Sequence, residues 1–167
     1  FGFPQFSGEI DSLRTLLEKA SHDSTRAGIQ LQLSEKLAKN ESAKATDLAL
    51  EALKYFQKTG DKKKQAVALG SAAYAFSNSG EYEQAIDYNL RALAIYEKLD
   101  VEIPDDIENK KSLCNIHNKL GAVYYYLANY DKAIEYWEKA LQFSSEINDK
   151  EGQAYLLNNI GLIYEKQ

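Results

Sequence analysis

Bulky and unusually small residues recur at fixed intervals between Cys114 and Leu141. Counting from Cys114 as position 1, they stand at positions 4, 7, 8, 11, 17, 20, 24 and 27. In order, these residues are His117, Leu120, Gly121, Tyr124, Tyr130, Ala133, Trp137 and Ala140. Residues three and four apart share one face of a helix, so the two groups of positions predict two amphipathic helices.

The same spacing recurs three more times along the chain. From Ala66 it is nearly complete, from Arg26 it is weaker, and from Ala154 it begins again before the sequence stops. The matching residues are Leu69, Ala72, Ala73, Phe76, Tyr82, Ala85, Asn89 and Ala92; Ile29, Leu33, Ala45, Ala49 and Ala52; and Leu157, Ile160, Gly161 and Tyr164. The chain is therefore expected to hold about three complete helix pairs and the first helix of a fourth.

Helix packing accounts for these residue types. Small residues at positions 8, 20 and 27, such as Gly121, Ala133 and Ala140, allow two antiparallel helices, and then the next pair, to approach closely. Aromatic residues at positions 11, 17 and 24 fill the gaps that remain between the helices. One pair cannot bury its apolar face alone, so the pairs must stack. We therefore expect an all-α fold.

The composition agrees with such a fold. Of the 167 residues, 44% are hydrophobic and 27% are charged, which suits a buried core and a soluble surface. The only two prolines are Pro4 and Pro104, so the long run between them has no helix breaker. No apolar stretch is long enough to span a bilayer, and no signal peptide is evident. Because methionine is absent, we expect a segment of a longer protein, and either a cytoplasmic or a periplasmic location stays open.

Local signals divide the chain into helices. The first helix is expected from Glu9 to Ala20, with Ser7 as a possible cap. Its apolar face would carry Ile10, Leu13, Leu16 and Leu17. Pro104, followed by Asp105 and Asp106, predicts the start of a later helix with acidic residues at its positive end. Breaks between helices are expected near Asn40, Gly60 and Asp61, Gly80, residues 100–104, Asn129, and Asn148 and Asp149.

The spacing resembles that of the tetratricopeptide repeat, over nearly the whole chain from Arg26 onward. The resemblance implies a single domain over 1–167, built as a solenoid of antiparallel helix pairs in a right-handed superhelix. Repeats would lie at 26–59, 66–99 and 114–147, the first helix of a further repeat at 154–167, and a capping or leftover helix at 9–21. The repeats are longer than usual and resemble those of kinesin light chain. Segments 60–76 and 147–167 look most like the sensor modules of bacterial signalling proteins.

Residues that could carry chemistry are few. With two histidines and one cysteine, the chain can form neither a disulfide nor a cysteine and histidine metal cluster, and we predict no metal, no cofactor and no enzyme. Cys114 and His117 have the spacing of a nucleophile and a base, but a packing role is favoured because no orienting group is evident. The basic run Lys62 to Lys64 stands in a chain of net charge −5, which argues against nucleic acid as a partner.

The resemblance also implies a binding surface, because positions 2, 5, 6, 9, 12 and 13 of each first helix line the concave groove in this family. The candidate ligand-binding residues at those positions are Tyr74, Asn115, Asn118, Lys119, Tyr125, Tyr126, Tyr155, Asn158 and Asn159. Asparagine amides can bond the main chain of an extended peptide, and tyrosines add broad contact area. The alternative is that asparagine at position 6, as in Asn159, is simply common in the family. Of the positions that form a two-carboxylate clamp in some co-chaperones, only Lys119 matches, so no such clamp is expected.

The favoured hypothesis is a module that binds a peptide or protein segment in its groove, as the sensing or docking part of a larger signalling regulator. One alternative is a structural scaffold or oligomerisation spacer that makes contacts through the ends of the stack. A more distant one is a small-molecule sensor. The helix from Ala154 lacks the second helix of its pair, so we also expect self-association through that helix, or fraying, and a stack that continues in the full-length protein.

Overall fold

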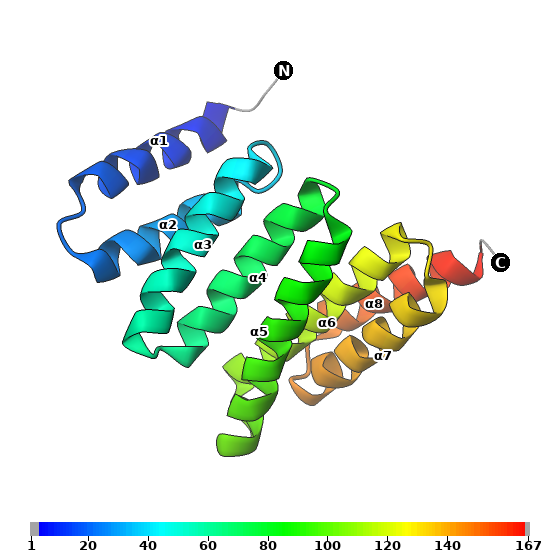
Figure 1. Cartoon of the computed structure of the whole chain (residues 1–167). Coiled ribbons are helices and arrows are strands. Elements are labelled where there is room, and N and C mark those ends of the chain that lie inside the picture. Colours follow the sequence, from blue (N-terminus) through cyan, green and yellow to red (C-terminus); the bar gives the residue numbers. More distant parts are fainter. Residues whose placement is uncertain (1–3, 166–167) are drawn as a thin grey trace. The chain divides into compact units, whose positions relative to one another are not determined.

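The computed structural model describes residues 4–165, and this part of the chain is entirely helical apart from the connecting turns. Its helices are α1 (Pro4–Lys19), α2 (Asp23–Leu37), α3 (Ser42–Thr59), α4 (Lys62–Asn78), α5 (Tyr82–Glu102), α6 (Ile107–Tyr126), α7 (Tyr130–Glu146) and α8 (Lys150–Tyr164). They fall into two compact units, residues 1–88 and 89–167, and α5 contributes to both. Successive helices form antiparallel pairs such as α2 with α3 and α6 with α7 (Figure 1), which confirms the all-α prediction.

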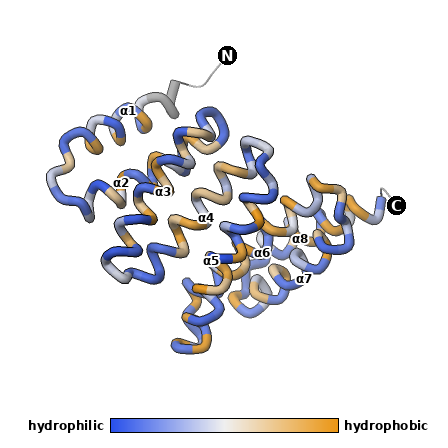
Figure 2. The backbone as a smooth tube through the Cα atoms, viewed as in Figure 1, coloured by the Kyte–Doolittle hydropathy of each residue, from blue (hydrophilic) through white to orange (hydrophobic). Residues whose placement is uncertain are grey.

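In the first unit, α2 packs against α1, α3 and α4, and α3 also packs against α4. Its core includes Leu33 and Leu37 of α2, Ala45 and Leu48 of α3 and Ala75 of α4. Hydrophobic and hydrophilic residues alternate along the helices of this unit (Figure 2), and each of α2, α3 and α4 has both buried and exposed residues.

Helix α1 differs from its prediction in two respects. It begins at Pro4 rather than near Glu9, so Ser7 lies inside the helix and not in front of it. Its apolar face is narrower than expected: Leu13 is buried, with Ile10 and Leu17 packed at the edge of the same core, whereas Leu16 is 53% exposed. Within the described residues, the main helix packed against α1 is α2, and one such neighbour covers a narrow stripe of a helix.

In the second unit, α7 packs between α6 and α8. Trp137 lies at the centre of this core with only 3% of its surface exposed, next to the fully buried Ala133 and Ala140 of the same helix. Gly121 of α6 allows the close approach, because a Cβ atom on that residue would lie 2.5 Å from Trp137 Cδ1. The positions predicted to be small are therefore the positions where the helices meet.

Each described junction between one pair and the next carries the same hydrogen bond. A side-chain amide near the start of the following helix donates to a main-chain carbonyl in the preceding one: Gln65 to Phe56 at 2.8 Å, Asn109 to Tyr96 at 3.0 Å and Gln153 to Ser144 at 3.3 Å. All three carbonyls occupy position 31 of their repeats. Each amide thus joins the first helix of one pair to the last helix of the pair before it.

The turns contain the residues that the sequence predicts. Asp61, Asn129 and Asp149 each accept a hydrogen bond from a main-chain N–H in the first turn of the next helix. Gly60 and Gly80 have positive φ angles, which glycine adopts at low cost.

The start of α6 was predicted incorrectly. Pro104 lies outside the helix, which begins at Ile107. Asp105 takes a left-handed conformation, with a φ angle of 69°, and pairs with Lys110 at 2.9 Å. Asp106 is the N-cap, and it accepts hydrogen bonds from the N–H groups of Glu108 and Asn109. The acidic residues still stand at the positive end of the helix, but one of them caps it from outside.

No helix within residues 4–165 is both long enough and apolar enough to cross a membrane.

Candidate functional site

The nine predicted binding residues lie on three helices. Tyr74 belongs to α4 in the first unit. The rest lie in the second unit: Asn115, Asn118, Lys119, Tyr125 and Tyr126 on α6, and Tyr155, Asn158 and Asn159 on α8. At helical spacing the α6 residues share one face, and so do those of α8. All nine are half-buried or exposed, so none belongs to the fully buried core.

Asn118 has a structural contact that the sequence did not reveal. The indole N–H of Trp137 donates to Asn118 Oδ1 at 3.1 Å and to its main-chain oxygen at 3.3 Å. A buried indole N–H needs such an acceptor. The bond orients the Asn118 amide, and its NH₂ group is the part that the indole does not use. Toward a peptide, Asn118 is therefore best suited to donate a hydrogen bond to a carbonyl oxygen.

Tyr125 and Tyr126 form one side of an aromatic cluster. The ring of Tyr125 lies 5.9 Å from that of Trp137, 5.8 Å from that of Tyr130 and 5.9 Å from that of Tyr126, measured between centroids. Tyr125 is half-buried by these contacts, whereas Tyr126 is 65% exposed. The packed rings give Tyr126 a rigid base, and a rigid exposed aromatic supplies contact area at low entropic cost.

The three residues on α8 are more accessible. Tyr155 and Asn158 are exposed and Asn159 is half-buried, while Leu156 and Ile163 of the same helix are packed into the core that contains Trp137. The buried residues hold α8 in place. The accessible amides and the tyrosine therefore stand on a supported helix.

Tyr74 has a different environment. It is half-buried and packs against the core of the first unit, and its main-chain oxygen accepts a hydrogen bond from the side chain of Asn78 at 2.7 Å. Its ring contributes to packing, which leaves less of it available to a ligand than of Tyr126 or Tyr155.

Cys114 and His117 are packing residues and not a nucleophile with its base. The Cys114 thiol donates to the main-chain oxygen of Ala140 at 3.4 Å, and burial raises its pKa. His117 stacks on Phe143 with ring centroids 5.7 Å apart and lies 5.8 Å from Tyr136. Burial, assisted by the charge of Lys139 and opposed by that of Glu135, lowers the pKa of His117 to about 4. The thiol is protonated and the imidazole neutral at neutral pH, so neither is activated.

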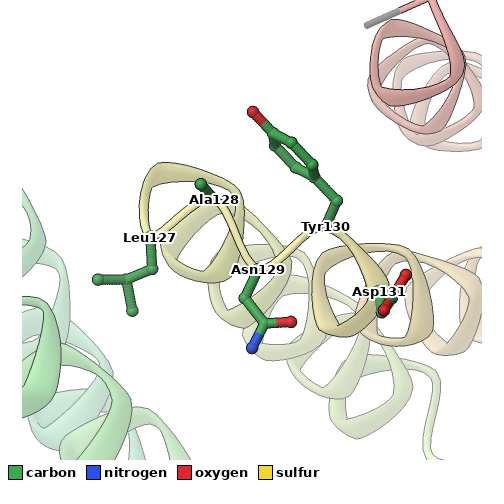
Figure 3. A pocket seen from close by; sticks show the side chains of 5 residues that line it. All are labelled: Leu127, Ala128, Asn129, Tyr130 and Asp131. Atoms are coloured by element: carbon green, nitrogen blue, oxygen red, sulfur yellow. The ribbon is translucent and has the colours of Figure 1, made fainter. Parts of the chain in front are cut away.

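A surface hollow of about 460 Å³ lies at the turn between α6 and α7, lined by Leu127, Ala128, Asn129, Tyr130 and Asp131. It was not predicted, although the sequence did indicate this turn. Figure 3 shows the side chain of Tyr130 pointing away from those of Leu127 and Asn129, and the side-chain oxygen of Asn129 is already used to cap α7. The hollow is wide open, and its polar groups do not converge on one point, so it lacks the features of a small-molecule site.

Among the described residues, no three histidine, cysteine or acidic side chains are grouped so that they could hold a metal ion.

Comparison with known families agrees with the helix pairs and their spacing. Two family models, both described as tetratricopeptide repeat, match residues 65–99 and 112–167, which together make up more than half of the chain. This chain is a tetratricopeptide repeat protein. Such repeats generally bind protein partners, and proteins built from them are typically non-catalytic.

Two curated relatives share part of this repeat region. The photosystem I assembly protein Ycf3 of Prochlorococcus marinus subsp. pastoris is 32% identical over 124 residues, or 74% of this chain. The uncharacterised protein ycf37 of Guillardia theta is 37% identical over 87 residues, or 51% of this chain. The chain spans 62% and 39% of the lengths of these two relatives.

Solved structures share the fold. BtubC (BKLC) from P. vanneervenii matches 97% of this chain with a TM-score of 0.78 and 22% identity, over 66% of its own length. A putative kinesin light chain with nearly identical repeats from Podosopora anserina also matches 97% of this chain, and 88% of its own length, with a TM-score of 0.55 and 15% identity. At these identities the similarity concerns the fold alone, and it agrees with the predicted resemblance to kinesin light chain repeats.

Proposed function

We propose that the chain is a non-catalytic module that binds an extended peptide or protein segment along the accessible faces of α6 and α8. The observation that carries this proposal is the composition of those faces, where amides and tyrosines stand outside the core on well-packed helices. Amides can pair with the main chain of a peptide, and tyrosines give contact area with a polar tip.

Within that role, Asn115, Asn118 and Asn158 bond the peptide backbone, and Tyr126 and Tyr155 cover its side chains. Lys119 supplies positive charge, and Asn159 and Tyr125 border the surface. The module acts as the sensing or docking part of a larger regulator, of the kind found in bacterial signalling proteins. A docking role in protein assembly is the related possibility that the name of the Ycf3 relative suggests.

The test uses peptides selected from a random library against the chain and titrated by calorimetry. Asn118 is left unchanged because its loss would also remove the partner of Trp137. A double variant with both Asn115→Ala and Asn158→Ala, which changes two exposed residues, should bind roughly thirtyfold more weakly, on the basis of about 1 kcal/mol for each of two hydrogen bonds. Asn40→Ala, which changes an exposed asparagine in the turn between α2 and α3, is the matched control. If the double variant and the control bound the peptide with equal affinity, the binding site would have to lie on another surface.

A second candidate is a scaffold or oligomerisation spacer that makes contacts through the end of its helix array. The observation that favours it is on α8, where Leu157 and Tyr164 are 55% and 61% exposed. In its simplest form, two copies pair through α8. Sedimentation equilibrium across a concentration series tests this, since a strictly monomeric chain at high concentration would exclude pairing. The third candidate, small-molecule sensing, has only the open hollow beside α7 in its favour.

A further inference from the structure

The described junctions between one helix pair and the next are closed by the same kind of hydrogen bond but differ in length. The donor amide follows the acceptor carbonyl by 9 residues between α3 and α4 and between α7 and α8, and by 13 residues between α5 and α6. Two pairs can therefore be joined with fewer residues than the α5–α6 junction contains. We call residues 97–108, which lie between the bonded Tyr96 and Asn109, the α5–α6 corner.

The α5–α6 corner exposes three branched aliphatic side chains. Val101, Ile103 and Ile107 are 81%, 60% and 61% exposed. The equivalent segments of the other two junctions, 57–64 and 145–152, include one large aliphatic residue, Ile147, and it is half-buried. Exposed apolar residues that stand singly need no explanation, but three in one short turn favour an interaction surface.

The chain reverses inside the corner and brings these residues to the place where α5 meets α6. The N–H group of Ile103 donates to the main-chain oxygen of Leu99 at 2.9 Å, and the N–H group of Asp106 donates to that of Ile103 at 3.4 Å. The Asn109 amide also donates to Asp100 Oδ1 at 3.3 Å. These bonds give the corner a defined conformation.

An ion pair holds the tip of the turn. Lys110 lies 2.9 Å from Asp105 and 3.0 Å from Glu146, so its charge is shared between two carboxylates. Asp105 has a φ angle of 69°, which a residue with a side chain adopts only at some cost. A segment that is ordered before binding loses less conformational entropy when a partner docks.

Acidic residues surround the exposed aliphatic ones. Residues 100–108 contain five acidic residues and no basic residue, so their formal charge of −5 equals that of the whole chain. In the sequence, the acids nearest to the three aliphatic residues are Asp100, Glu102, Asp105, Asp106 and Glu108.

The one basic residue of the corner, Lys98, does little to neutralise it. Lys98 lies 4.0 Å from Glu102, and both side chains are more than half exposed, so solvent screening makes this pair weak. Glu108 is exposed as well. The corner therefore presents apolar side chains within a negative field.

This combination narrows the class of partner. A negative surface repels nucleic acid and anionic lipid headgroups, which carry charge of the same sign. Among the described residues, no three acidic, histidine or cysteine side chains are grouped to hold a metal ion. A basic protein segment that also carries aliphatic side chains complements both the charge and the apolar residues.

We propose that the α5–α6 corner is a docking site for a short basic segment of a partner protein, in which aliphatic residues alternate with lysine or arginine. Its aliphatic side chains cover Val101, Ile103 and Ile107, and its cations pair with the carboxylates beside them. The inference goes beyond the proposed function, because it uses none of the groove amides or tyrosines. A second copy of the chain is the poorer occupant, since it brings the same acids and its basic run Lys62 to Lys64 contains no aliphatic residue.

The experiment uses three fluorescently labelled synthetic peptides of equal length, titrated against the whole chain and followed by anisotropy. Lysine alternates with isoleucine in the first peptide and with serine in the second, and glutamate alternates with isoleucine in the third. The first peptide should bind saturably, with one peptide per chain. The other two should bind at least roughly tenfold more weakly, because each lacks either the apolar or the basic side chains.

Variants of the chain locate the site. The protein with Val101→Gln, Ile103→Gln and Ile107→Gln should bind the first peptide roughly tenfold more weakly than the parent protein does. Glu102→Gln combined with Glu108→Gln should also weaken binding, and circular dichroism should show unchanged helicity in both proteins. The matched control changes three exposed aliphatic residues elsewhere and should bind like the parent: Leu16→Gln, Leu90→Gln and Leu157→Gln.

Four results would overturn the proposal: no saturable binding of the first peptide, equal binding of the first and second peptides, equal binding of the first and third, or equal binding to the corner variant and the matched control. Self-association of the parent chain in sedimentation that the corner variant lacks would also overturn it, in favour of a second copy. The protein with both Asn115→Ala and Asn158→Ala should bind the first peptide like the parent protein. Failure of the groove proposal and failure of this one are therefore distinguishable.

Discussion

The α2–α3 and α6–α7 pairs place their large side chains on opposite helices. In α2–α3, position 8 is Leu33 and position 24 is Ala49, and in α6–α7 the same positions are Gly121 and Trp137. All four residues are buried. The large side chain comes from the first helix in α2–α3 and from the second helix in α6–α7. The repeat therefore fixes the combined volume of the side chains at positions 8 and 24, and it leaves open which of the two positions carries the large residue.

Removing the large side chain at either of these positions should lower the stability more than any other change considered. Trp137→Ala should lower the free energy of unfolding by about 3–5 kcal/mol, because it leaves a large cavity and an unpaired acceptor on Asn118. Urea unfolding followed by circular dichroism measures the change. Leu33→Ala, the equivalent loss in the other pair, should cost about 2–5 kcal/mol. A Trp137→Ala protein as stable as the parent would show that the repeat positions assigned here are wrong.

Acid should weaken the pair α6–α7, which contains His117, more than the pair α2–α3. Its pKa is about 4 in the folded chain and 6.5 ordinarily, so the unfolded chain binds more protons between these values. The contribution of His117 to stability is complete above about pH 6.5 and is lost as the pH falls toward 4, by at most about 3 kcal/mol. The equivalent residue in α2–α3 is Ile29, which does not titrate.

Hydrogen exchange at pH 7 and pH 4.5 measures this difference. Amides of α6 and α7 should lose protection relative to those of α2 and α3, and His117→Phe should abolish most of the loss. Equal loss of protection in both pairs at the lower pH would contradict the assignment to His117.

A larger residue in place of Gly121 should also be destabilising, because the combined volume at positions 8 and 24 is limited. Gly121→Ala puts a methyl group against the indole of Trp137 and should cost about 1–3 kcal/mol, although alanine is the better helix former. Combining it with Trp137→Leu should cost less than the sum of the two single changes. A double-mutant cycle with thermal melts gives the coupling energy, and strict additivity would mean that the two positions do not share a volume.

Asn89 offers the smallest test, because it is the residue at position 24 of the remaining repeat. It is fully buried, and neither its amide nitrogen nor its amide oxygen has a hydrogen-bond partner. Asn89→Leu should raise the free energy of unfolding by about 1 kcal/mol, because it removes an unsatisfied polar group of similar size. A clear loss of stability would indicate that the amide has a role that packing does not explain.

The sequence predicted the helices and their buried faces well, because periodic small and aromatic residues report directly on helix contacts. It failed where local geometry competes with pattern. The first turn of α6 depends on a left-handed Asp105 and a cap from Asp106, and neither is visible in spacing alone. Leu16 was placed in the core because its own helix is amphipathic, while its exposure depends on how few neighbours that helix has.

The candidate site was predictable only in part. The family pattern selects the helix positions of the proposed site, but it carries no information about side-chain partners. In the sequence, Asn118 is one of several asparagines at groove positions. Its hydrogen bond to Trp137 could not be predicted from this pattern, because Trp137 is 19 residues away. Tyr74 and Tyr126 occupy similar places in the pattern yet differ in exposure, because their neighbours differ.

The amide that bridges each pair to the next has a consequence for building new arrays. Gln65, Asn109 and Gln153 all bond the carbonyl at position 31, although they sit in different local sequences. In each helix pair the acceptor is therefore the carbonyl at position 31, and the donor is a side-chain amide near the start of the next pair. A helix pair could be duplicated, deleted or exchanged at these points, provided that the donor and its carbonyl are joined in the correct register. These hydrogen-bonded junctions are thus the points at which new arrays could be assembled from the helix pairs of this chain.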